Sequence, residues 1–389
     1  MEYRKLGNTG LKTSILGMGC MRLPVIDNEE TNINRVETSK MFDYAIDHGV
    51  NAFDTAYVYH SDMVNIGDSP LFLGDYMEER GCRKDIILST KLPSFSLTGK
   101  EGELDEYLNR ELEALKTDYV DVYFLHNVDS ETWKIYEKDG LFDFMDETLL
   151  DGRVKHWGIS FHREPELLDK MLDSSNKFEV VLTQNNYLDD QFDKQAPSSI
   201  VKKHNLGNYI MEPLRGGTLA NGLPESALKI IEKYAPGRSP VELAFKYLYQ
   251  NPDYTTIFSG MNSLEQVKEN ISIAEDYSKN PLKDSDFKVL EDVASNLYKL
   301  RGNPCTYCGY CMPCPNNVNI RGCFREYNTF KIIGREHEQA DWRYFGVVFP
   351  GTRADECTGC EDCLSKCPQG IDIPTELEKV TEFFGPSPE

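Results

Sequence analysis

Short β-rich runs alternate with longer helical patterns over roughly the first 280 residues, and this alternation restricts the fold more than any other feature. Between the runs, apolar residues recur at helical spacing, as at Leu104, Leu108, Leu112 and Leu115. Mostly apolar strands that alternate with helices are typical of parallel β/α units. Eight runs predict strands: 15–21, 51–56, 85–91, 120–126, 156–161, 180–187, 209–214 and 255–261.

Eight such units over about 260 residues indicate an α/β fold, the closed (β/α)8 TIM barrel. The alternative is an open doubly wound sheet, which carries a glycine-rich turn after its first strand. The segment GMGCMRLP (17–24) does not form G-x-G-x-x-G with a helix behind it, which favours the barrel. Residues 3–13 predict a hairpin, with its turn at Asn8, Thr9 and Gly10, that plugs the N-terminal end of the barrel.

The cysteines predict a second domain. The chain has eleven; Cys20 and Cys82 stand alone, and the rest lie between 305 and 367. We therefore expect a barrel over 1–283, a connecting amphipathic helix over 284–300 and a small cysteine-rich domain over 301–389. The N-terminus shows no apolar export signal. We therefore expect a cytoplasmic location and no disulfides. No run approaches 18 apolar residues, so no membrane span is expected either.

The cysteine spacing predicts two [4Fe–4S] clusters. Residues 357–368 read C-x₂-C-x₂-C-x₃-C-P, the bacterial ferredoxin run whose fourth cysteine ligates the other cluster. Residues 305–315 read C-x₂-C-x₂-C-x₂-C-P, one residue shorter. The assignment we favour is crossed. One cluster takes Cys305, Cys308, Cys311 and Cys367, and the other takes Cys357, Cys360, Cys363 and Cys314.

Zinc is the competing interpretation, but its tetrahedral sites usually use two separated C-x₂-C pairs, which these runs do not match. Helical patterns after each motif, at 319–331 and 373–384, favour a mainly helical ferredoxin-like domain. Cys323, Cys20 and Cys82 are expected to pack in the core.

Titratable residues stand at three consecutive strand ends, where barrels of this kind carry their active sites. Asp54 and Tyr59 follow the second strand, Lys91 ends the third and His126 ends the fourth. A phenol is a poor acid at neutral pH unless a cation favours its phenolate, and Lys91, held by Asp54, can supply that charge. His126 would then donate to a carbonyl oxygen that Tyr59 protonates as hydride reaches the carbon. The alternative is a structural Lys91–Asp54 ion pair beside an ordinary strand-end histidine.

In DTAYVY, STK and FLH, these four residues resemble the catalytic tetrad of the aldo-keto reductases. The resemblance spans about residues 3–275 and implies that Tyr59 is the general acid/base. It also implies NADP(H) or NAD(H) bound without a Rossmann domain. Together with the cysteine motifs, it points to the iron–sulfur subgroup of that family. The cofactor contacts it implies are Ser160 and Gln184 for the carboxamide, Pro213, Leu214, Gly216 and Gly217 for the pyrophosphate, and Ser263, Gln266 and Asn270 for the adenosine phosphates.

The sequence departs from the family in three places. Phe161 stands where many members carry an asparagine that contacts the carboxamide. The loop after Tyr59, residues 60–74, is expected to be longer than usual and has Pro70 where a glutamate is common. No arginine stands near Ser263, where Lys268 is the only nearby cation, and Arg215 is expected to be exposed to solvent rather than to contact a phosphate.

Three functions are compatible with these features. The first is an NAD(P)-dependent reductase of a small carbonyl or alcohol substrate, whose clusters exchange electrons with a ferredoxin or flavodoxin-like partner. The second is an electron-transfer or redox-activating protein without carbonyl turnover, and in the third the clusters are structural. Hydride carries two electrons and each cluster one, and the sequence shows no flavin signature to join them. The net charge of −22 argues against nucleic-acid binding.

Overall fold

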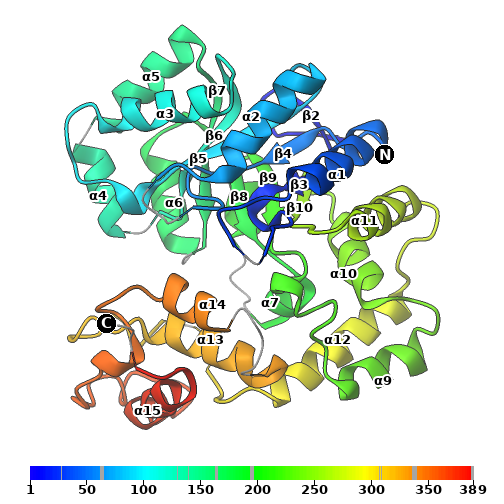
Figure 1. Cartoon of the computed structure of the whole chain (residues 1–389). Coiled ribbons are helices and arrows are strands. Elements are labelled where there is room, and N and C mark those ends of the chain that lie inside the picture. Colours follow the sequence, from blue (N-terminus) through cyan, green and yellow to red (C-terminus); the bar gives the residue numbers. More distant parts are fainter. Residues whose placement is uncertain are drawn as a thin grey trace. The chain divides into compact units, whose positions relative to one another are not determined.

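The computed structural model describes the chain except residues 28, 62–64, 129, 139, 163–164, 193–196, 306, 308, 335–339 and 387–389. The chain divides into two compact units (Figure 1). Unit 1 comprises Met1–Asn186, Gln195–Gly216 and Val241–Lys283, and unit 2 comprises Tyr187–Lys194, Gly217–Pro240 and Asp284–Glu389. Among the described residues, no helix has both the length and the apolar character that a bilayer crossing requires.

Unit 1 is built on a closed barrel of parallel strands, in the order β10-β3-β4-β5-β6-β7-β8-β9. This confirms the predicted (β/α)8 fold, and each of the eight predicted runs overlaps one strand. The strands are β3 (Leu16–Gly19), β4 (Ala52–Asp54), β5 (Ile87–Leu92), β6 (Val120–His126), β7 (Val154–Phe161), β8 (Phe178–Gln184), β9 (Gly207–Met211) and β10 (Thr256–Ser259).

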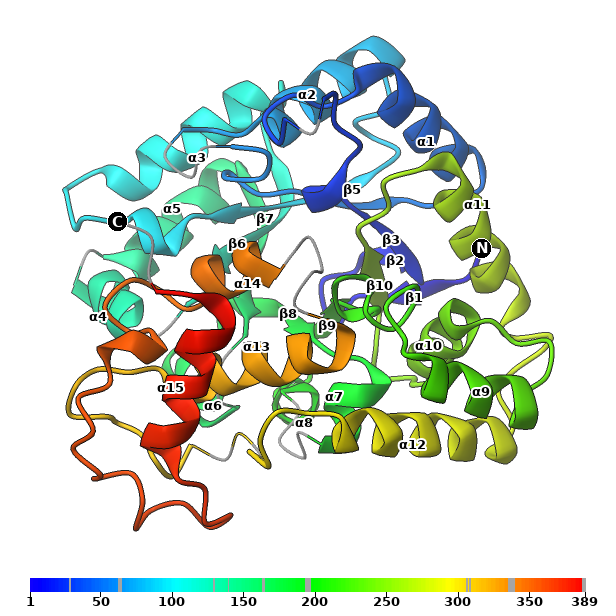
Figure 2. The same ribbon diagram turned by 60° about the horizontal axis from the view of Figure 1, so that its bottom comes forward.

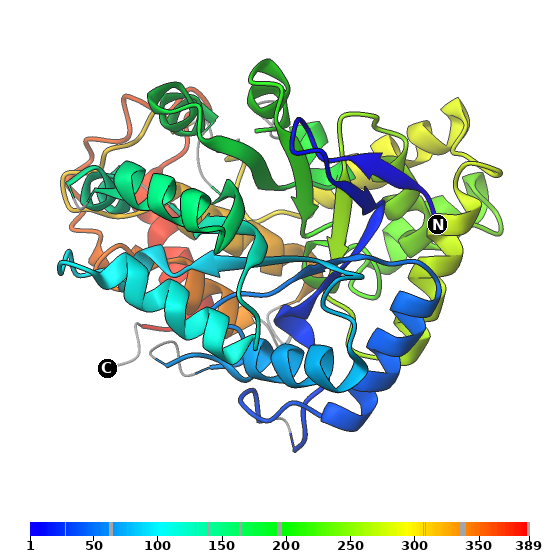
Figure 3. The same ribbon diagram turned by 90° about the horizontal axis from the view of Figure 1, so that it is seen from above.

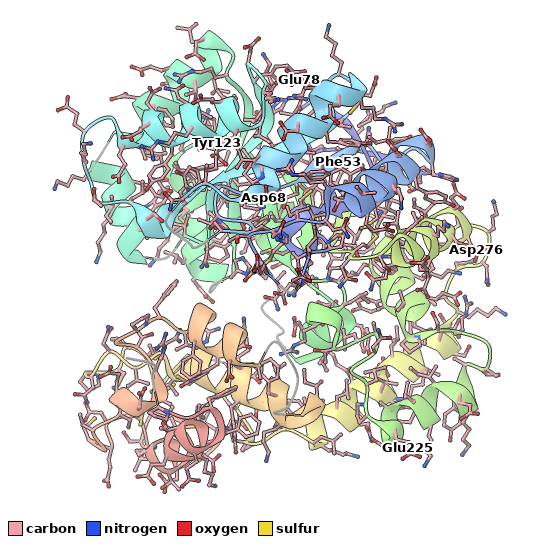
Figure 4. All side chains as sticks on the ribbon, in the orientation of Figure 1. Phe53, Asp68, Glu78, Tyr123, Glu225 and Asp276 are labelled. Carbon is pink, nitrogen blue, oxygen red and sulfur yellow. The ribbon has the colours of Figure 1, made fainter. Side chains whose placement is uncertain are left out.

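Helices cover the outside of this barrel and bury their apolar faces against it. In α3, for example, Leu104, Leu108 and Leu112 are buried, as their spacing predicts. The core between strands and helices includes Phe53 of β4 and Tyr123 of β6, both labelled in Figure 4. The helices are α1 (Arg35–Asp47), α2 (Asp68–Arg80), α3 (Glu103–Ala114), α4 (Ser130–Lys138), α5 (Leu141–Asp151), α6 (Pro165–Ser174), α8 (Ser198–Lys203), α10 (Pro240–Tyr249) and α11 (Leu264–Asp276).

The predicted N-terminal hairpin is present and fills one end of the barrel (Figure 3). Strands β1 (Tyr3–Lys5) and β2 (Lys12–Ser14) pair antiparallel. Leu6, between them, is fully buried in a cluster with inward-facing strand residues such as Phe124 and Tyr209. The turn also lies against Gly207, the first residue of β9, so the hairpin closes the end opposite to the carboxyl ends of the strands.

Unit 2 is helical: its described residues contain no strand. Helix α12 packs against α7 and α9, while α13, α14 and α15 pack on one another (Figure 2). The second group encloses a core of its own that includes Phe324, Tyr344 and Phe384. The predicted helical character of the C-terminal region is therefore confirmed. The helices are α7 (Tyr187–Phe192), α9 (Glu225–Tyr234), α12 (Asp284–Lys299), α13 (Ile320–Ile333), α14 (Ala340–Val347) and α15 (Ile373–Phe384).

Candidate active site

The structure brings together the four residues singled out at the strand ends. Asp54 ends β4, Lys91 lies near the end of β5 and His126 ends β6, while Tyr59 follows β4 by one short turn. The Lys91 Nζ lies 2.5 Å from Asp54 Oδ2 and 4.6 Å from the centroid of the Tyr59 ring. The Tyr59 and His126 ring centroids are 6.0 Å apart, edge to face. One ammonium, one carboxylate, one phenol and one imidazole therefore share a single small space.

The Lys91–Asp54 ion pair is buried, and other polar groups complete its hydrogen bonding. Lys91 is 1% exposed and Asp54 is 5% exposed. The Lys91 Nζ also donates to the Thr55 carbonyl at 2.7 Å, and Ser89 Oγ donates to Asp54 Oδ1 at 2.7 Å. Burial alone would lower the pKa of Lys91, but the Asp54 carboxylate and the Tyr59 oxygen raise it above its ordinary value. The ammonium is thus held charged beside Tyr59.

Burial also decides the protonation of the two aromatic groups. It raises the pKa of the Tyr59 phenol, and the Lys91 ammonium opposes this rise without overcoming it. The expected influence of Lys91 on Tyr59 has the right sign, but burial is the larger effect, so the phenol keeps its proton at neutral pH. Burial, followed by the positive charges of Lys91 and His162, holds the pKa of His126 well below its ordinary value. His126 is therefore a neutral imidazole that carries a single N–H.

The backbone around Tyr59 is fixed by the start of α2. The N–H of Asp68 donates to the His60 carbonyl at 2.9 Å, and the N–H of Ser69 donates to the Tyr59 carbonyl at 3.2 Å. These are N–H groups that a helix N-terminus leaves unpaired. A Cβ atom on Gly67 would lie 1.9 Å from the Tyr59 carbonyl oxygen, so only glycine allows this approach.

The segment 60–74, which was expected to be a loop, is only partly one. Helix α2 begins at Asp68, which is labelled in Figure 4, so the connection ends at Gly67. Pro70 is buried within the first turn of α2, where a missing N–H removes no helical hydrogen bond. Gly67 and Pro70 mark the start of this helix.

His60 is a site-supporting residue that sequence reasoning missed. Its Nε2 accepts the Leu23 N–H at 3.2 Å, and its Nδ1 donates to the Glu30 carbonyl at 2.7 Å. This pair of bonds requires the neutral tautomer, and burial lowers the pKa of His60. The residue ties the segment after β3 to the turn that carries Tyr59. Its partners are backbone groups some 30 to 37 residues away, so no local pattern announces it.

The two implied carboxamide contacts lie at the ends of the two strands that follow β6 in the barrel. Ser160, near the end of β7, is paired in register with His126, and Gln184 ends the neighbouring strand β8. The Ser160 hydroxyl is buried and has no hydrogen-bond partner among the described residues. A buried hydroxyl without a partner is costly, which fits a site that receives a polar ligand group. Phe161 is fully buried next to it.

The implied phosphate contacts at the start of α11 are engaged with one another. Ser263 Oγ caps the helix by accepting the Gln266 N–H at 3.3 Å, and Gln266 Oε1 accepts the Asn262 N–H at 2.9 Å. Asn270 is buried and donates to Ser259 Oγ at 3.1 Å. These bonds organise the helix N-terminus.

The PLRGG segment follows β9 as a tight turn. Pro213, Leu214 and Gly216 lie in unit 1, and Gly217 begins a segment of unit 2. Arg215 is 8% exposed, so the expectation that it faces solvent is wrong. Arg215 stands within the turn, with φ of +48° and its N–H donating to the Glu212 carbonyl at 3.0 Å.

In unit 2, cysteines from both motifs line two hollows. Cys308 lies outside the described residues, and none of the described cysteines forms a disulfide. One hollow is lined by Cys311, Cys314, Cys357, Cys360 and Cys363, and the other by Cys305, Cys311 and Cys367. Each hollow thus combines cysteines from both motifs. Cys323 packs in the core of the unit instead, and Cys20 and Cys82 are buried in unit 1.

Comparison with known families agrees with both parts. The model of the "Aldo/keto reductase family" matches residues 15–295, and that of a "4Fe-4S dicluster domain" matches residues 304–371. The chain belongs to the aldo/keto reductase family. The second match covers every cysteine of the two motifs, so this aldo/keto reductase also carries a 4Fe-4S dicluster domain, as the sequence predicted.

Individual proteins that resemble this chain share about a quarter of its aligned residues. The "Uncharacterized oxidoreductase YqkF" of Bacillus subtilis is 27% identical over 328 residues, which cover 77% of this chain and 99% of the relative. The "Putative voltage-gated potassium channel subunit beta" of Schizosaccharomyces pombe is 25% identical over 320 residues, with 71% and 88% covered. The holo structure of aldo-keto reductase AKR11C1 from Bacillus halodurans has a TM-score of 0.60 at 24% identity, with 75% and 96% covered, and shows the shared fold. The chain is thus an oxidoreductase of the aldo-keto reductase type.

In this aldo/keto reductase, one residue that supports the ion pair could have been found from the sequence. Ser89 stands two residues before Lys91 in one strand, and residues at that spacing face the same side, so Ser89 could have been predicted as a partner of Asp54. Gly67 and Ser69, which fix the backbone of Tyr59, could not, because their role depends on where α2 begins.

Proposed function

We propose that this protein interconverts a small carbonyl compound and its alcohol with NADP(H) or NAD(H), assisted by electron transfer through two [4Fe–4S] clusters. The observation that carries the proposal is the Lys91 ammonium, set between the Asp54 carboxylate and the Tyr59 ring at the carboxyl ends of the barrel strands. Membership of the aldo/keto reductase family supports it.

The nicotinamide, when bound, supplies hydride to the carbonyl carbon. Tyr59 gives its proton to the carbonyl oxygen, so the carbonyl gains a hydride and a proton and becomes the alcohol. The Lys91 ammonium stabilises the phenolate left behind, and Asp54 keeps that ammonium in place. Neutral His126 donates its N–H to the same oxygen. Solvent then returns a proton to Tyr59.

The cofactor contacts are proposed on the same basis. Ser160 is assigned to the carboxamide because its buried hydroxyl has no partner among the described residues, and Gln184 is assigned on the next strand. The backbone N–H groups at the start of α11 suit the adenosine phosphates, since helix N-termini attract anions. The remaining proposed contacts are Pro213, Leu214, Gly216, Gly217, Ser263, Gln266 and Asn270.

For the clusters we propose the crossed ligand set, with Cys305, Cys308, Cys311 and Cys367 on one and Cys314, Cys357, Cys360 and Cys363 on the other. One hollow joins Cys314 to the first three cysteines of the second motif, and the other joins Cys367 to Cys305, which supports the crossed set; Cys311 lines both hollows. Each cluster carries one electron, so the pair can take two in turn from a one-electron carrier such as a ferredoxin or flavodoxin-like protein. Thiols kept free for iron suit the reducing cytoplasm.

Two measurements test this function. Anaerobic protein should contain about eight iron atoms per chain and bind NADPH or NADH; two zinc atoms instead would contradict the cluster assignment. Tyr59→Phe should slow carbonyl reduction about 10²- to 10⁴-fold with little change in cofactor affinity. Tyr57→Phe is the matched control, because Tyr57 is a buried tyrosine of the same turn that packs on Tyr107. Unchanged turnover in Tyr59→Phe would show that the tetrad is not catalytic.

The second candidate is a ferredoxin-linked electron-transfer or redox-activating protein without carbonyl turnover. It is favoured by Phe161, which is buried beside Ser160 and offers no polar group to a carboxamide. In that case neither nicotinamide would bind, while a reduced ferredoxin would still reduce the clusters. Tight nicotinamide binding with hydride transfer would exclude it.

A further inference from the structure

One side chain outside the cysteine set links the two motifs. Asn316 follows Cys314 by two residues, and its Nδ2 donates to Thr358 Oγ1 at 2.8 Å and to Cys360 Sγ at 3.6 Å. It thereby joins positions 42 and 44 residues apart in the sequence. Asn316 also lines the hollow formed by Cys314 and the second motif.

The amide can serve both acceptors because it carries two N–H groups. The Thr358 hydroxyl takes one and fixes the orientation of the side chain, which directs the other to the sulfur. Reduction of a [4Fe–4S] cluster adds negative charge that is shared with its thiolates. A hydrogen bond to a ligand sulfur stabilises this form and raises the reduction potential.

The two hollows differ in the charges and donors around the cysteines. Glu361 and Asp362 line the hollow of Asn316, and their negative charges disfavour reduction. Arg321 lines the other hollow, where the Tyr307 backbone N–H donates to Cys305 Sγ at 3.3 Å. Asn316 is thus a side-chain donor that offsets a more acidic setting.

We propose that Asn316 is a positioning residue that sets the potential of the cluster held by Cys314, Cys357, Cys360 and Cys363, raising it toward that of the other cluster. This rests on the crossed ligand set proposed above. It predicts that the two clusters respond differently to a single substitution.

The test is a redox titration of the anaerobic holoprotein, followed by the electron paramagnetic resonance of the reduced clusters. Asn316→Leu removes the donor at similar size and should weaken the electron affinity of one cluster about tenfold, a fall of about 59 mV for one electron. Asn316→Asp, which adds a charge, should lower it further. The second cluster is the internal reference and should keep its potential. Thr358→Val removes only the bond that orients the Asn316 amide, so it should lower the same potential by a smaller amount.

Iron analysis separates failure of this inference from failure of the proposed function. Wild-type protein without about eight iron atoms would overturn the cluster assignment itself. Two clusters with unchanged potentials in Asn316→Leu would overturn only the role of Asn316. If Asn316→Leu loses a cluster, wild-type protein labelled with ¹⁵N-asparagine decides: spin-echo coupling of the reduced cluster to a side-chain amide nitrogen supports the inference, and its absence overturns it.

Discussion

The barrel site and the cysteine hollows gather their polar groups by different means. In the barrel, Asp54 and Lys91 stand on the adjacent strands β4 and β5, in which Asp54 is paired with Ser89, and Ser89 and Thr55 complete their hydrogen bonding. In unit 2 the cysteines come from irregular segments before α13 and before α15. Their thiols remain partly accessible, and Cys360 is exposed. Hydrogen bonds between its own residues therefore complete the barrel site, whereas the thiols that line the hollows remain accessible to a ligand.

The difference follows from the bonding of the two regions. A strand in a closed barrel has neighbours on both sides, so its end residues cannot shift without breaking the ladder. The cysteine segments are anchored mainly where they meet the core of α13, α14 and α15, which the thiols themselves help to pack. Metal binding to such a segment contributes folding free energy directly. Substitutions in the hollows should therefore remove iron and local order, whereas substitutions in the barrel site should lower the free energy of unfolding.

The largest effect is expected from a cysteine of unit 2. Cys314→Ala should remove the cluster held with Cys357, Cys360 and Cys363, so that about four of the eight iron atoms are lost. Hydrogen exchange over 304–371 should rise at least tenfold, while the amides of β5 and β6 keep their protection. Mass spectrometry of exchanged peptides measures both.

Cys323→Ala is the matched control for that experiment. Cys323 is fully buried in the core of the same unit and lines neither hollow. It should keep all the iron and lose only the packing of one small side chain. In Cys314→Ala, loss of the cluster held by Cys305, Cys308 and Cys311, with the cluster of the second motif intact, would show that the ligand sets are not crossed.

Lys91→Met tests how much the buried ion pair of the barrel contributes to stability. It leaves the buried Asp54 carboxylate without its cation, which should cost about 3–5 kcal/mol of unfolding free energy. Denaturant unfolding, followed by a signal from the barrel, measures this loss of unfolding free energy. Carbonyl turnover should fall as well, because the Tyr59 phenolate loses its stabilising charge.

Stability and turnover separate in a double variant. Asp54→Asn combined with Lys91→Met removes both charges and should recover most of the lost stability, since the two neutral side chains have similar volumes to the originals. Turnover should stay low. A double variant that regains turnover would show that Lys91 is only a structural partner of Asp54.

The sequence predicted the parts that depend on periodic patterns. Eight apolar runs predicted eight strands, and the strand ends predicted that Asp54, Lys91 and His126 would converge. The cysteine spacing predicted a cluster domain that the family comparison supports. These features depend on local composition and on the geometry that any closed parallel barrel imposes.

What the sequence did not predict depends on three-dimensional context. The start of α2 at Asp68 and the burial of Arg215 differ from the expected loop over 60–74 and the expected exposure of Arg215. The bonds of His60 join backbone groups of two separate segments, so no spacing encodes them. The net pKa of Tyr59 could not be predicted either, because burial opposes the effect of Lys91 and only the folded chain shows how much burial there is.

Glu111, which lies close to the barrel site, is a buried carboxyl that forms no ion pair with a described residue. Glu111 of α3 is fully buried, and its two oxygens accept from Thr90 Oγ1 at 2.5 Å and from the Tyr123 hydroxyl at 2.6 Å. Unlike Asp54, it has hydroxyl partners in place of a cation. Burial raises its pKa from 4.5 to about 8, despite these bonds.

Glu111→Gln should therefore change how stability depends on pH. The folded chain binds this proton more tightly than the unfolded chain, so the stabilisation is complete below about pH 4.5 and is lost as the pH rises through 8. Each pH unit in that window costs about 1.4 kcal/mol, a few kcal/mol in all. Glutamine keeps the shape without a charge, and the two hydroxyls can turn to accept its N–H. The variant should match the parent at pH 5 and exceed it by a few kcal/mol at pH 9 in denaturant unfolding. Glu113 is exposed on the same helix, so Glu113→Gln should have the same unfolding free energy as the parent at both pH values. If the unfolding free energy of Glu111→Gln changes with pH as steeply as that of the parent, Glu111 stays charged in the folded barrel.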